Sequence, residues 1–260
     1  MNALWCALLV AGCGTQFSDP IREAPSAAGG EAGAPAVTDP NVCSAEPVQE
    51  FSGANFATMM RLVQDDFTIE VWIKTAVSLA GTGAYVGNPI VFADVPTIVT
   101  DDFGAGLLND KFQMTTGNPD TSVKSTSNVT TDTWVHVAAT RTRASGLVLV
   151  FVNGVLEGVG TGNTNALSAS PTMSIGGRAD RDFFVGQMSE LRIWSTTRTQ
   201  AEILEHMHRR LAGNEAGLVG YYPLDDKAGP SVHDASPSQN HAMLAAPSEP
   251  AAADPPVCGQ

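Results

Sequence analysis

One short segment constrains the fold of this chain more than any other: residues 67–74, FTIEVWIK, alternate strictly between two kinds of side chain. Successive side chains of a β-strand point to opposite faces, so a period of two fits a strand and not a helix. One face would carry Phe67, Ile69, Val71 and Ile73. The other would carry Thr68, Glu70, Trp72 and Lys74. We therefore expect a sheet with one face against an apolar core.

Strands of this kind recur along the chain. Residues 134–143 alternate in the same way, and residues 147–152 form an apolar run typical of a strand buried on both faces. Asn153 and Gly154 tolerate positive φ and predict a type I′ hairpin turn. Further strands are expected at 51–58, 89–93, 97–100, 111–116, 121–126, 172–176, 184–194 and 218–224. With 25 glycines and 16 prolines to form turns, the chain is predicted to be all-β, a two-sheet antiparallel β-sandwich.

One segment has a helical pattern instead. Thr199 and Glu202 have the spacing of a capping box, in which each side chain bonds to the other residue's backbone N–H. Apolar residues then follow at helical spacing up to Leu211, and Gly213 can end the helix in a left-handed conformation. We expect one short helix at 200–211.

The first residues are typical of an exported protein. Residues 3–11 are apolar but too few to span a bilayer. The following VAGC at 10–13 resembles a bacterial lipobox, which implies cleavage before Cys13 and lipid on that cysteine. Residues 1–12 would be the signal peptide, and the protein would be anchored in the cell envelope, at the outer membrane, or secreted. An ordinary secretory peptide cut elsewhere and a cytoplasmic protein are the alternatives.

Two regions and a cysteine pair follow from this expectation. Residues 13–42 are rich in Ala, Gly, Pro and Ser and predict a flexible linker after the lipidated cysteine, which leaves 43–258 as the folded domain. Because export leads to an oxidising compartment, Cys43 and Cys258 are expected to form a disulfide that joins the two ends of the domain. Two free thiols are the alternative.

The charge of the chain restricts its partners. The formal net charge is −13, with 14 basic against 27 acidic residues. Such a surface repels phosphate groups, so nucleic acid and anionic membrane surfaces are excluded as partners, and contact with a membrane is expected only through the lipid. Neutral sugars and divalent cations are easier partners.

Several segments in fixed order resemble one family. They are 51–53 (FSG), 67–72 (FTIEVW), 103–109 (FGAGLLN), 134–141 (WVHVAATR), 152–155 (VNGV), 184–194 (FVGQMSELRIW) and 217–224 (GLVGYYPL). Together they resemble the laminin-G-like jelly rolls of the concanavalin A-like lectin/glucanase superfamily. The resemblance implies two antiparallel sheets in a jelly roll. It also implies a binding role toward glycans or proteins, often outside cells and sometimes with calcium.

Two aromatic residues are candidates for contact with a sugar. Trp72 shares a strand face with polar side chains and would stack on a sugar ring if that face were open. Packing in the core is the alternative for Trp72, as for any tryptophan in a sandwich strand. Tyr85, before the strand at 89–93, is the second candidate.

Calcium is the expected cofactor, because it binds hard oxygen ligands and the loops are rich in Asp and Asn. The first candidate site comprises Asp225, Asp226, Asp234 and Asn240. The second comprises Asp101 and Asp102. The alternative for both is that these residues form turns through local hydrogen bonds.

Three functions remain open from the sequence. The first is an exported, lipid-anchored binding module for a glycan or an extracellular protein, assisted by calcium. The second is a structural or adhesive envelope module without a small ligand. The third is a glycoside hydrolase, which needs two carboxylates flanking the scissile bond. Because Glu70 is alone on its strand and Glu190 shares its segment only with Arg192, no such motif is present, and we expect no catalysis.

Overall fold

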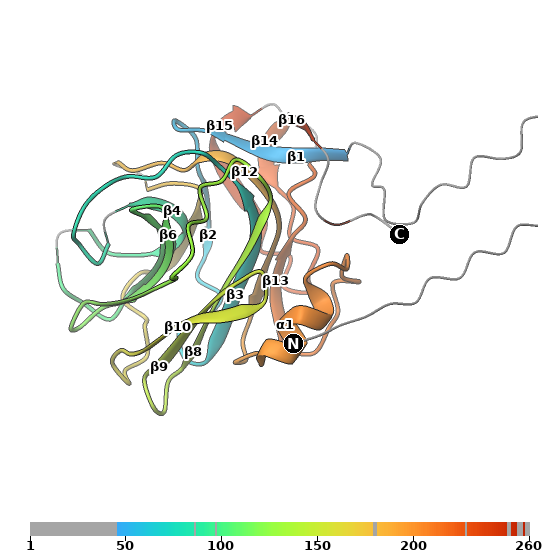
Figure 1. The fold of residues 1–260 in the computed structure, drawn as a ribbon. Coiled ribbons are helices and arrows are strands. Elements are labelled where there is room, and N and C mark those ends of the chain that lie inside the picture. Colours follow the sequence, from blue (N-terminus) through green and yellow to red (C-terminus); the bar gives the residue numbers. More distant parts are fainter. Residues whose placement is uncertain are drawn as a thin grey trace, which may run out of the picture. The chain divides into compact units, whose positions relative to one another are not determined.

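The alternating segment at 67–74 forms strand β3 (Phe67–Lys74), which lies in the middle of an antiparallel sheet (Figure 1). The computed structural model describes residues 46–85, 87–96, 98–178, 181–226, 228–248, 251–253 and 257. They all lie in one unit, Asp39–Gln260. As predicted, the described part is an antiparallel β-sandwich of two sheets.

The sheet that contains β3, which we name sheet A, has the order β10-β9-β8-β3-β12-β1-β16, with β13 also paired to β12. Its strands are β1 (Glu46–Ser52), β3, β8 (Val135–Thr142), β9 (Leu147–Val152), β10 (Val155–Thr161), β12 (Val185–Trp194), β13 (Leu218–Tyr222) and β16 (Ala251–Ala253). The turn between β9 and β10 has positive φ at Asn153 (48°) and Gly154 (74°), which confirms the predicted hairpin.

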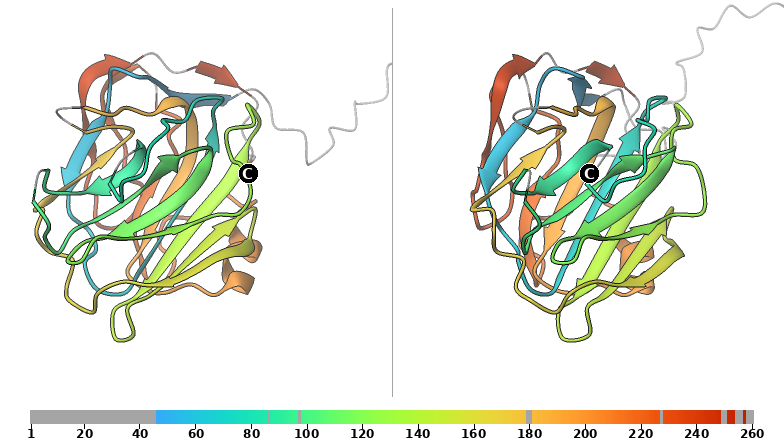
Figure 2. Two further views of the ribbon diagram at one scale, coloured as in Figure 1. Left: turned by 60° about the vertical axis from the view of Figure 1, so that its left-hand side comes forward. Right: turned by 90° about the vertical axis from the view of Figure 1, so that its left-hand side faces the viewer.

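The second sheet, which we name sheet B, has the order β14-β15-β2-β11-β4-β5-β6-β7. Its strands are β2 (Ala57–Met60), β4 (Asn88–Ala93), β5 (Phe103–Leu108), β6 (Lys111–Thr116), β7 (Thr121–Lys124), β11 (Thr172–Ile175), β14 (Gly229–Val232) and β15 (Ala242–Ser248). Figure 2 shows the two sheets as stacked layers from two further sides.

The core lies between the two sheets. The face of β3 predicted to be apolar enters it, with Phe67, Ile69, Val71 and Ile73 at most 1% exposed. Phe67 of sheet A meets Phe103 of sheet B with their ring centroids 4.9 Å apart. Burial of this apolar face is the main stabilising contribution that joins the sheets.

The single helix of the described residues, α1 (Gln200–His206), lies on the face of sheet A that points away from sheet B (Figure 1). Its N-terminus has the predicted capping box between Thr199 and Glu202. The helix ends at His206, five residues earlier than predicted, because the carbonyl oxygens of His206 and Arg209 accept hydrogen bonds from the Arg192 guanidinium. Among the described residues, no helix combines the length and apolar character that crossing a bilayer requires.

Two strand predictions were wrong. The segment 51–58 is not one strand: β1 ends at Ser52, whose backbone N–H bonds to the Asn55 side chain, and the chain then passes to β2 in the other sheet. Residues 98–100 lie in a loop, and Thr97 is outside the described residues. Strands β5, β14, β15 and β16 were not predicted as strands.

Candidate ligand-binding site

The structure does not leave Trp72 open for a sugar ring, which corrects the first candidate. The polar face of β3 is covered by α1 and the turn that follows it, so Trp72 is only 6% exposed. Its indole N–H donates to the backbone carbonyl oxygen of Met207 at 2.7 Å. The imidazole rings of His136 and His208 each lie 5.2 Å from the indole, centroid to centroid. Trp72 is therefore a packing residue.

A buried polar network fills the rest of this covered face. Glu70 is fully buried, accepts a hydrogen bond from the Trp194 indole at 2.9 Å, and lies 3.4 Å from Nε2 of buried His136. Burial raises the pKa of Glu70, but His136 and the positive charge of Arg192 outweigh it and hold that pKa below its usual value. Burial lowers the pKa of His136 and outweighs the opposing effect of the adjacent Glu70 carboxylate.

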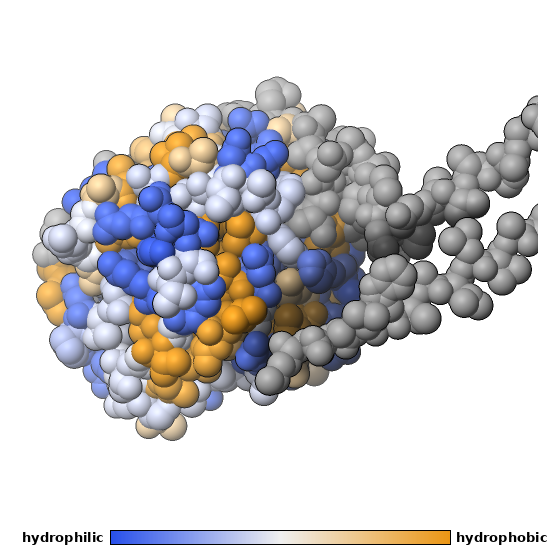
Figure 3. Space-filling view, viewed as in Figure 1, coloured by the Kyte–Doolittle hydropathy of each residue, from blue (hydrophilic) through white to orange (hydrophobic). Residues whose placement is uncertain are grey.

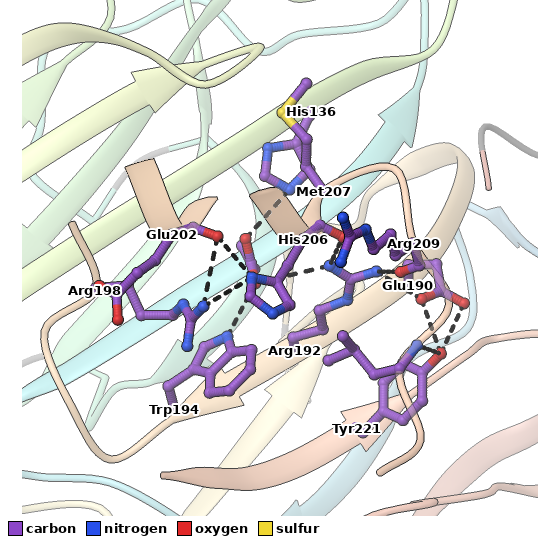
Figure 4. Close-up of polar contacts among 12 residues, drawn as sticks. His136, Glu190, Arg192, Trp194, Arg198, Glu202, His206, Met207, Arg209 and Tyr221 are labelled. Carbon is purple, nitrogen blue, oxygen red and sulfur yellow. Dashed lines mark hydrogen bonds and ion pairs between the residues drawn. The ribbon is translucent and has the colours of Figure 1, made fainter. Parts of the chain in front are cut away.

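Arg192 connects this network to the helix (Figure 4). Its guanidinium pairs with Glu190 at 2.8 Å and donates to the His206 carbonyl oxygen at 2.8 Å. The Tyr221 hydroxyl also donates to the Glu190 carboxylate, which is 3% exposed, and lies 3.0 Å from its Oε1 and 2.8 Å from its Oε2. The network holds α1 against sheet A. Because Glu70 and Glu190 are both buried, they do not form an accessible pair of carboxylates that could flank a glycosidic bond.

Residues at both ends of α1 also contact sheet A. The Arg198 guanidinium stacks on the Trp194 ring at 3.9 Å and bonds to Nδ1 of His206 at 3.0 Å. Its backbone N–H bonds to the Thr68 hydroxyl of β3. His206 is half-buried, and these contacts connect the helix to sheet A.

In the first predicted calcium cluster the buried carboxylate holds backbone in place. Asp234 is 1% exposed. Its Oδ1 accepts the backbone N–H groups of Tyr221 and Ser236, and its Oδ2 accepts that of Asn240, all at 2.9 Å. Asp234 thus acts as an anchor for the loop between β13 and β15.

The other members of this cluster also have protein partners. Asp225 pairs with Arg210, and Asp226 accepts the backbone N–H of His233. Asn240 bonds through its side chain to both the N–H and the carbonyl oxygen of Met60. Among the described residues, no group of three or more His, Cys, Asp or Glu side chains is placed to hold a metal ion. The arrangement therefore does not fit a calcium site, and calcium binding stays an untested prediction.

The two aspartates of the second predicted calcium site, Asp101 and Asp102, have different hydrogen-bond partners. Asp102 is 2% exposed and accepts hydrogen bonds from the Tyr85 hydroxyl at 2.5 Å and the Val95 N–H at 3.0 Å. The Asp101 carboxylate accepts hydrogen bonds from the side-chain amides of Asn118 and Asn165. Burial raises the pKa of Asp102, and burial and the adjacent Asp102 raise the pKa of Tyr85. Tyr85, the second sugar candidate, is half-buried beside a different site, described next.

The predicted lipidation site Cys13 and the predicted disulfide between Cys43 and Cys258 lie outside the described residues. The same is true of the signal peptide and linker predicted over 1–42. These stay predictions.

The outer face of sheet B, away from sheet A, holds a pocket. Along β2 and β11 the residues Ala57, Met59, Met173 and Ile175 enter the core. The alternate side chains therefore point outward. One row of directly paired residues crosses this face from β15 to β7: Met243, Thr58, Ser174, Phe92, Gly104, Thr115 and Ser122.

The pocket lies over the middle of this row and has a volume of about 340 Å³. It is lined by Phe56, Thr58, Phe92, Asp94, Pro96, Ser170, Thr172, Met173, Ser174 and Arg178. Within the described part of the chain, the hydroxyls of Thr58, Thr172 and Ser174 form no hydrogen bond. Three adjacent hydroxyls are thus available to a ligand.

The ring of Phe92 lies against sheet B beside this pocket and is 3% exposed. Phe92 points outward, and its ring covers Gly104 and Gly106 of the neighbouring strand, where an added Cβ would lie 2.8 Å and 3.1 Å from ring atoms. The Tyr85 ring meets Phe92 edge-on at 6.3 Å. The Arg178 guanidinium lies 5.6 Å from the centre of the Phe92 ring. The two glycines therefore allow Phe92 to lie against the sheet.

Our sequence prediction missed this pocket. Its residues come from three segments far apart in the sequence, 56–58, 92–96 and 170–178, and none of them forms a short motif. One signal was available: the FGAGLL of β5 places glycine at two alternate positions, which indicates that something covers that strand face closely.

The stacked antiparallel sheets with a ligand-sized pocket on one face define a lectin-like jelly-roll β-sandwich. The chain belongs to the laminin G type of the concanavalin A-like lectin/glucanases superfamily, whose family profile matches residues 50–204. No curated protein sequence matches the chain.

A solved structure shares the fold. A candidate carbohydrate-binding protein from Bacteroides ovatus superposes with a TM-score of 0.65 at 21% identity, over 82% of this chain and 62% of that protein. The chain thus spans less than two thirds of that relative. Mouse laminin α1 domains LG4–5 align with a TM-score of 0.45 at 13% identity, over 61% of this chain and 46% of that one.

Proposed function

We propose that this domain is a non-catalytic glycan-binding module and that its ligand binds in the pocket on the outer face of sheet B. The observation that carries the proposal is the set of three available hydroxyls, Thr58, Thr172 and Ser174, beside the half-buried aromatic ring of Phe56. The fold likeness to the Bacteroides ovatus protein, described as carbohydrate-binding, supports this class of ligand.

The chemistry of the pocket suits a sugar. A saccharide presents hydroxyls that both donate and accept hydrogen bonds, together with apolar C–H faces that pack on aromatic rings. Serine and threonine hydroxyls also donate and accept, so they match a sugar hydroxyl in either role. The volume of about 340 Å³ is within the range of small-ligand sites. The opposite face of the sandwich is covered by α1, so we do not place the ligand there.

The setting of the module is part of the proposal. A lipid on Cys13 would tether it to a bacterial envelope, the linker to residue 42 would separate it from the membrane, and a Cys43–Cys258 disulfide would close its ends. Mass spectrometry of the intact protein, with and without reduction, tests both modifications. The proposal does not depend on calcium, and a thermal melt with and without chelator tests that cofactor: a lower midpoint with chelator supports calcium, and an unchanged one removes it.

An adhesive role is the second candidate, because one edge of the sandwich exposes apolar side chains. On edge strand β10, Val155 is 55% exposed and Val159 is 65% exposed. Figure 3 shows a hydrophobic region over this strand. Such a surface suits a protein partner better than a sugar. The variant Val159→Lys should weaken binding of a protein partner to the β10 edge and leave glycan binding unchanged.

The proposed function is tested by a glycan array followed by titration calorimetry with the best ligand. The double variant Thr172→Val/Ser174→Ala removes two hydroxyls without adding bulk, and we expect about tenfold weaker binding. Thr161→Val, on exposed β10 of the other sheet, is the matched control and should bind as the wild type does. An empty array with the folded protein, or equal binding by the double variant, contradicts the proposal.

A further inference from the structure

The pocket contains two charged side chains, and they are paired with each other. Asp94 and Arg178 form an ion pair, with side chains only 5% and 6% exposed. They are the charged residues among those that line the pocket, so the lining carries no net charge. Because the pair is almost fully removed from water, its electrostatic effect inside the pocket is screened weakly.

The surroundings of Arg178 leave its charge balanced. Its guanidinium also donates to the Tyr85 carbonyl oxygen at 2.9 Å and lies 3.9 Å from the Asp182 carboxylate. A carboxylate on a ligand would therefore meet a cation that already has two anionic neighbours. It would also approach Asp94, and two like charges at short distance repel each other.

A smaller neighbouring pocket also disfavours a negatively charged ligand. It has a volume of about 180 Å³ and shares Asp94, Pro96 and Arg178 with the first. Its charged lining consists of Asp94, Asp102, Asp120, Arg178 and Arg181, which is three acidic against two basic residues. The chain as a whole carries a net charge of −13. The acidic residues of the second pocket therefore outnumber its basic residues by one, which disfavours a ligand carboxylate that extends into it.

We infer that the pocket binds uncharged saccharides and rejects acidic ones, and that Asp94 is the residue that sets this preference. The inference rests on the proposed function, since it names the class of sugar for the same pocket. Neutral hydroxyls can approach the Asp94–Arg178 pair without unbalancing it, whereas a uronic or sialic acid adds an uncompensated negative charge. Asp94 thus acts by excluding anionic ligands.

The test compares neutral and acidic oligosaccharides that share a core, such as lactose against sialyllactose and xylan oligomers against their glucuronic acid forms. For a core that binds, we expect the acidic form to bind at least about tenfold more weakly. Acidic forms that bind as tightly as neutral ones overturn the inference and leave the glycan-binding proposal in place. Failure of every glycan, neutral and acidic, overturns the proposed function and the inference with it.

A charge variant tests the role of Asp94 itself. Asp94→Asn keeps the shape but removes the carboxylate closest to Arg178 and leaves only Asp182, 3.9 Å away, so the neutral-to-acidic preference should fall about tenfold. Asp65→Asn is the control, because Asp65 is 49% exposed and pairs with Arg143 elsewhere. An unchanged preference in folded Asp94→Asn contradicts the inference.

If Asp94→Asn does not fold, the salt dependence of wild-type binding gives a second measurement. Added salt should leave the affinity for a neutral glycan unchanged and should tighten the weak binding of its acidic form, because salt screens repulsion. Acidic glycans that bind more weakly as salt is added would indicate attraction and would overturn the inference.

Discussion

The indole N–H of Trp194 donates a hydrogen bond to Glu70 at 2.9 Å, and both side chains are fully buried. The bond joins neighbouring strands β12 and β3 on the face covered by α1. A buried carboxylate is stable only when its hydrogen bonds and its charge are matched, and here Trp194, His136 and Arg192 provide the match. The segment from 195 to 217 is therefore held on by polar contacts as well as by apolar packing.

Replacement of this carboxylate should destabilise the domain. Glu70→Gln keeps the size but removes the negative charge that faces buried Arg192, so we expect a loss of about 3 kcal/mol in the free energy of unfolding. Urea titration measures it. Glu205→Gln, on the exposed side of α1, is the control and should stay within about 0.5 kcal/mol of the wild type. An equal effect of the two variants would contradict the account of the network.

His136 should make stability depend on pH. Its native pKa is lowered from 6.5 by burial, so below pH 6.5 the unfolded chain takes up a proton that the native protein resists. The stability that the unprotonated, buried imidazole of His136 contributes is fully present above pH 6.5. It is lost as the pH falls through the native pKa of His136. Between pH 6.5 and 5 we expect the wild type to lose about 1–2 kcal/mol more stability than His136→Gln does. Urea titration at each pH measures the free energy of unfolding. An equal loss of stability in the two proteins between pH 6.5 and 5 would contradict this prediction.

Buried Arg141 should be essential for the loops at one end of the sandwich. Its guanidinium donates to the carbonyl oxygens of Asp65 and Asn165 at 2.7 Å and of Asn163 at 3.1 Å. Arg141→Met would leave these oxygens without a donor, at an expected cost of about 3 kcal/mol by urea titration. Arg143→Met, with a side chain 46% exposed, should cost much less. Equal losses would show that the buried bonds are not the cause.

Gly104 should control the position of Phe92. A methyl group at Gly104 would lie 2.8 Å from the Phe92 ring, so Gly104→Ala should displace that ring, destabilise the domain by about 1–3 kcal/mol and weaken glycan binding. In a Phe92→Leu background the same methyl has more room, so its cost should fall. A double-mutant cycle measures this coupling. Additive effects would place the strain elsewhere.

Local pattern predicted much of the sandwich because each strand carries its own period. The alternation at 67–74, the hairpin at Asn153 and Gly154 and the capping box at Thr199 depend on neighbouring residues alone. The split of 51–58 into two strands was missed, because only the different sheets that its two ends join distinguish them.

The site was much harder to predict, since it depends on what covers each sheet face. Trp72 looked available on its strand, but α1, more than a hundred residues later, closes that face. Asp234 has the residue type of a metal ligand, yet its oxygens hold the backbone of its own loop and of β13. Thr58, Ser174 and Phe92 become neighbours only through strand pairing.

The most direct test of the account is NMR mapping of the bound glycan on isotopically labelled protein, with the tightest ligand from the array. The account predicts that chemical shifts change at Thr58, Thr172, Ser174 and Phe92 and stay constant on the α1 face around Trp72. Shift changes confined to the 225–240 loop, the β10 edge or the α1 face would contradict it.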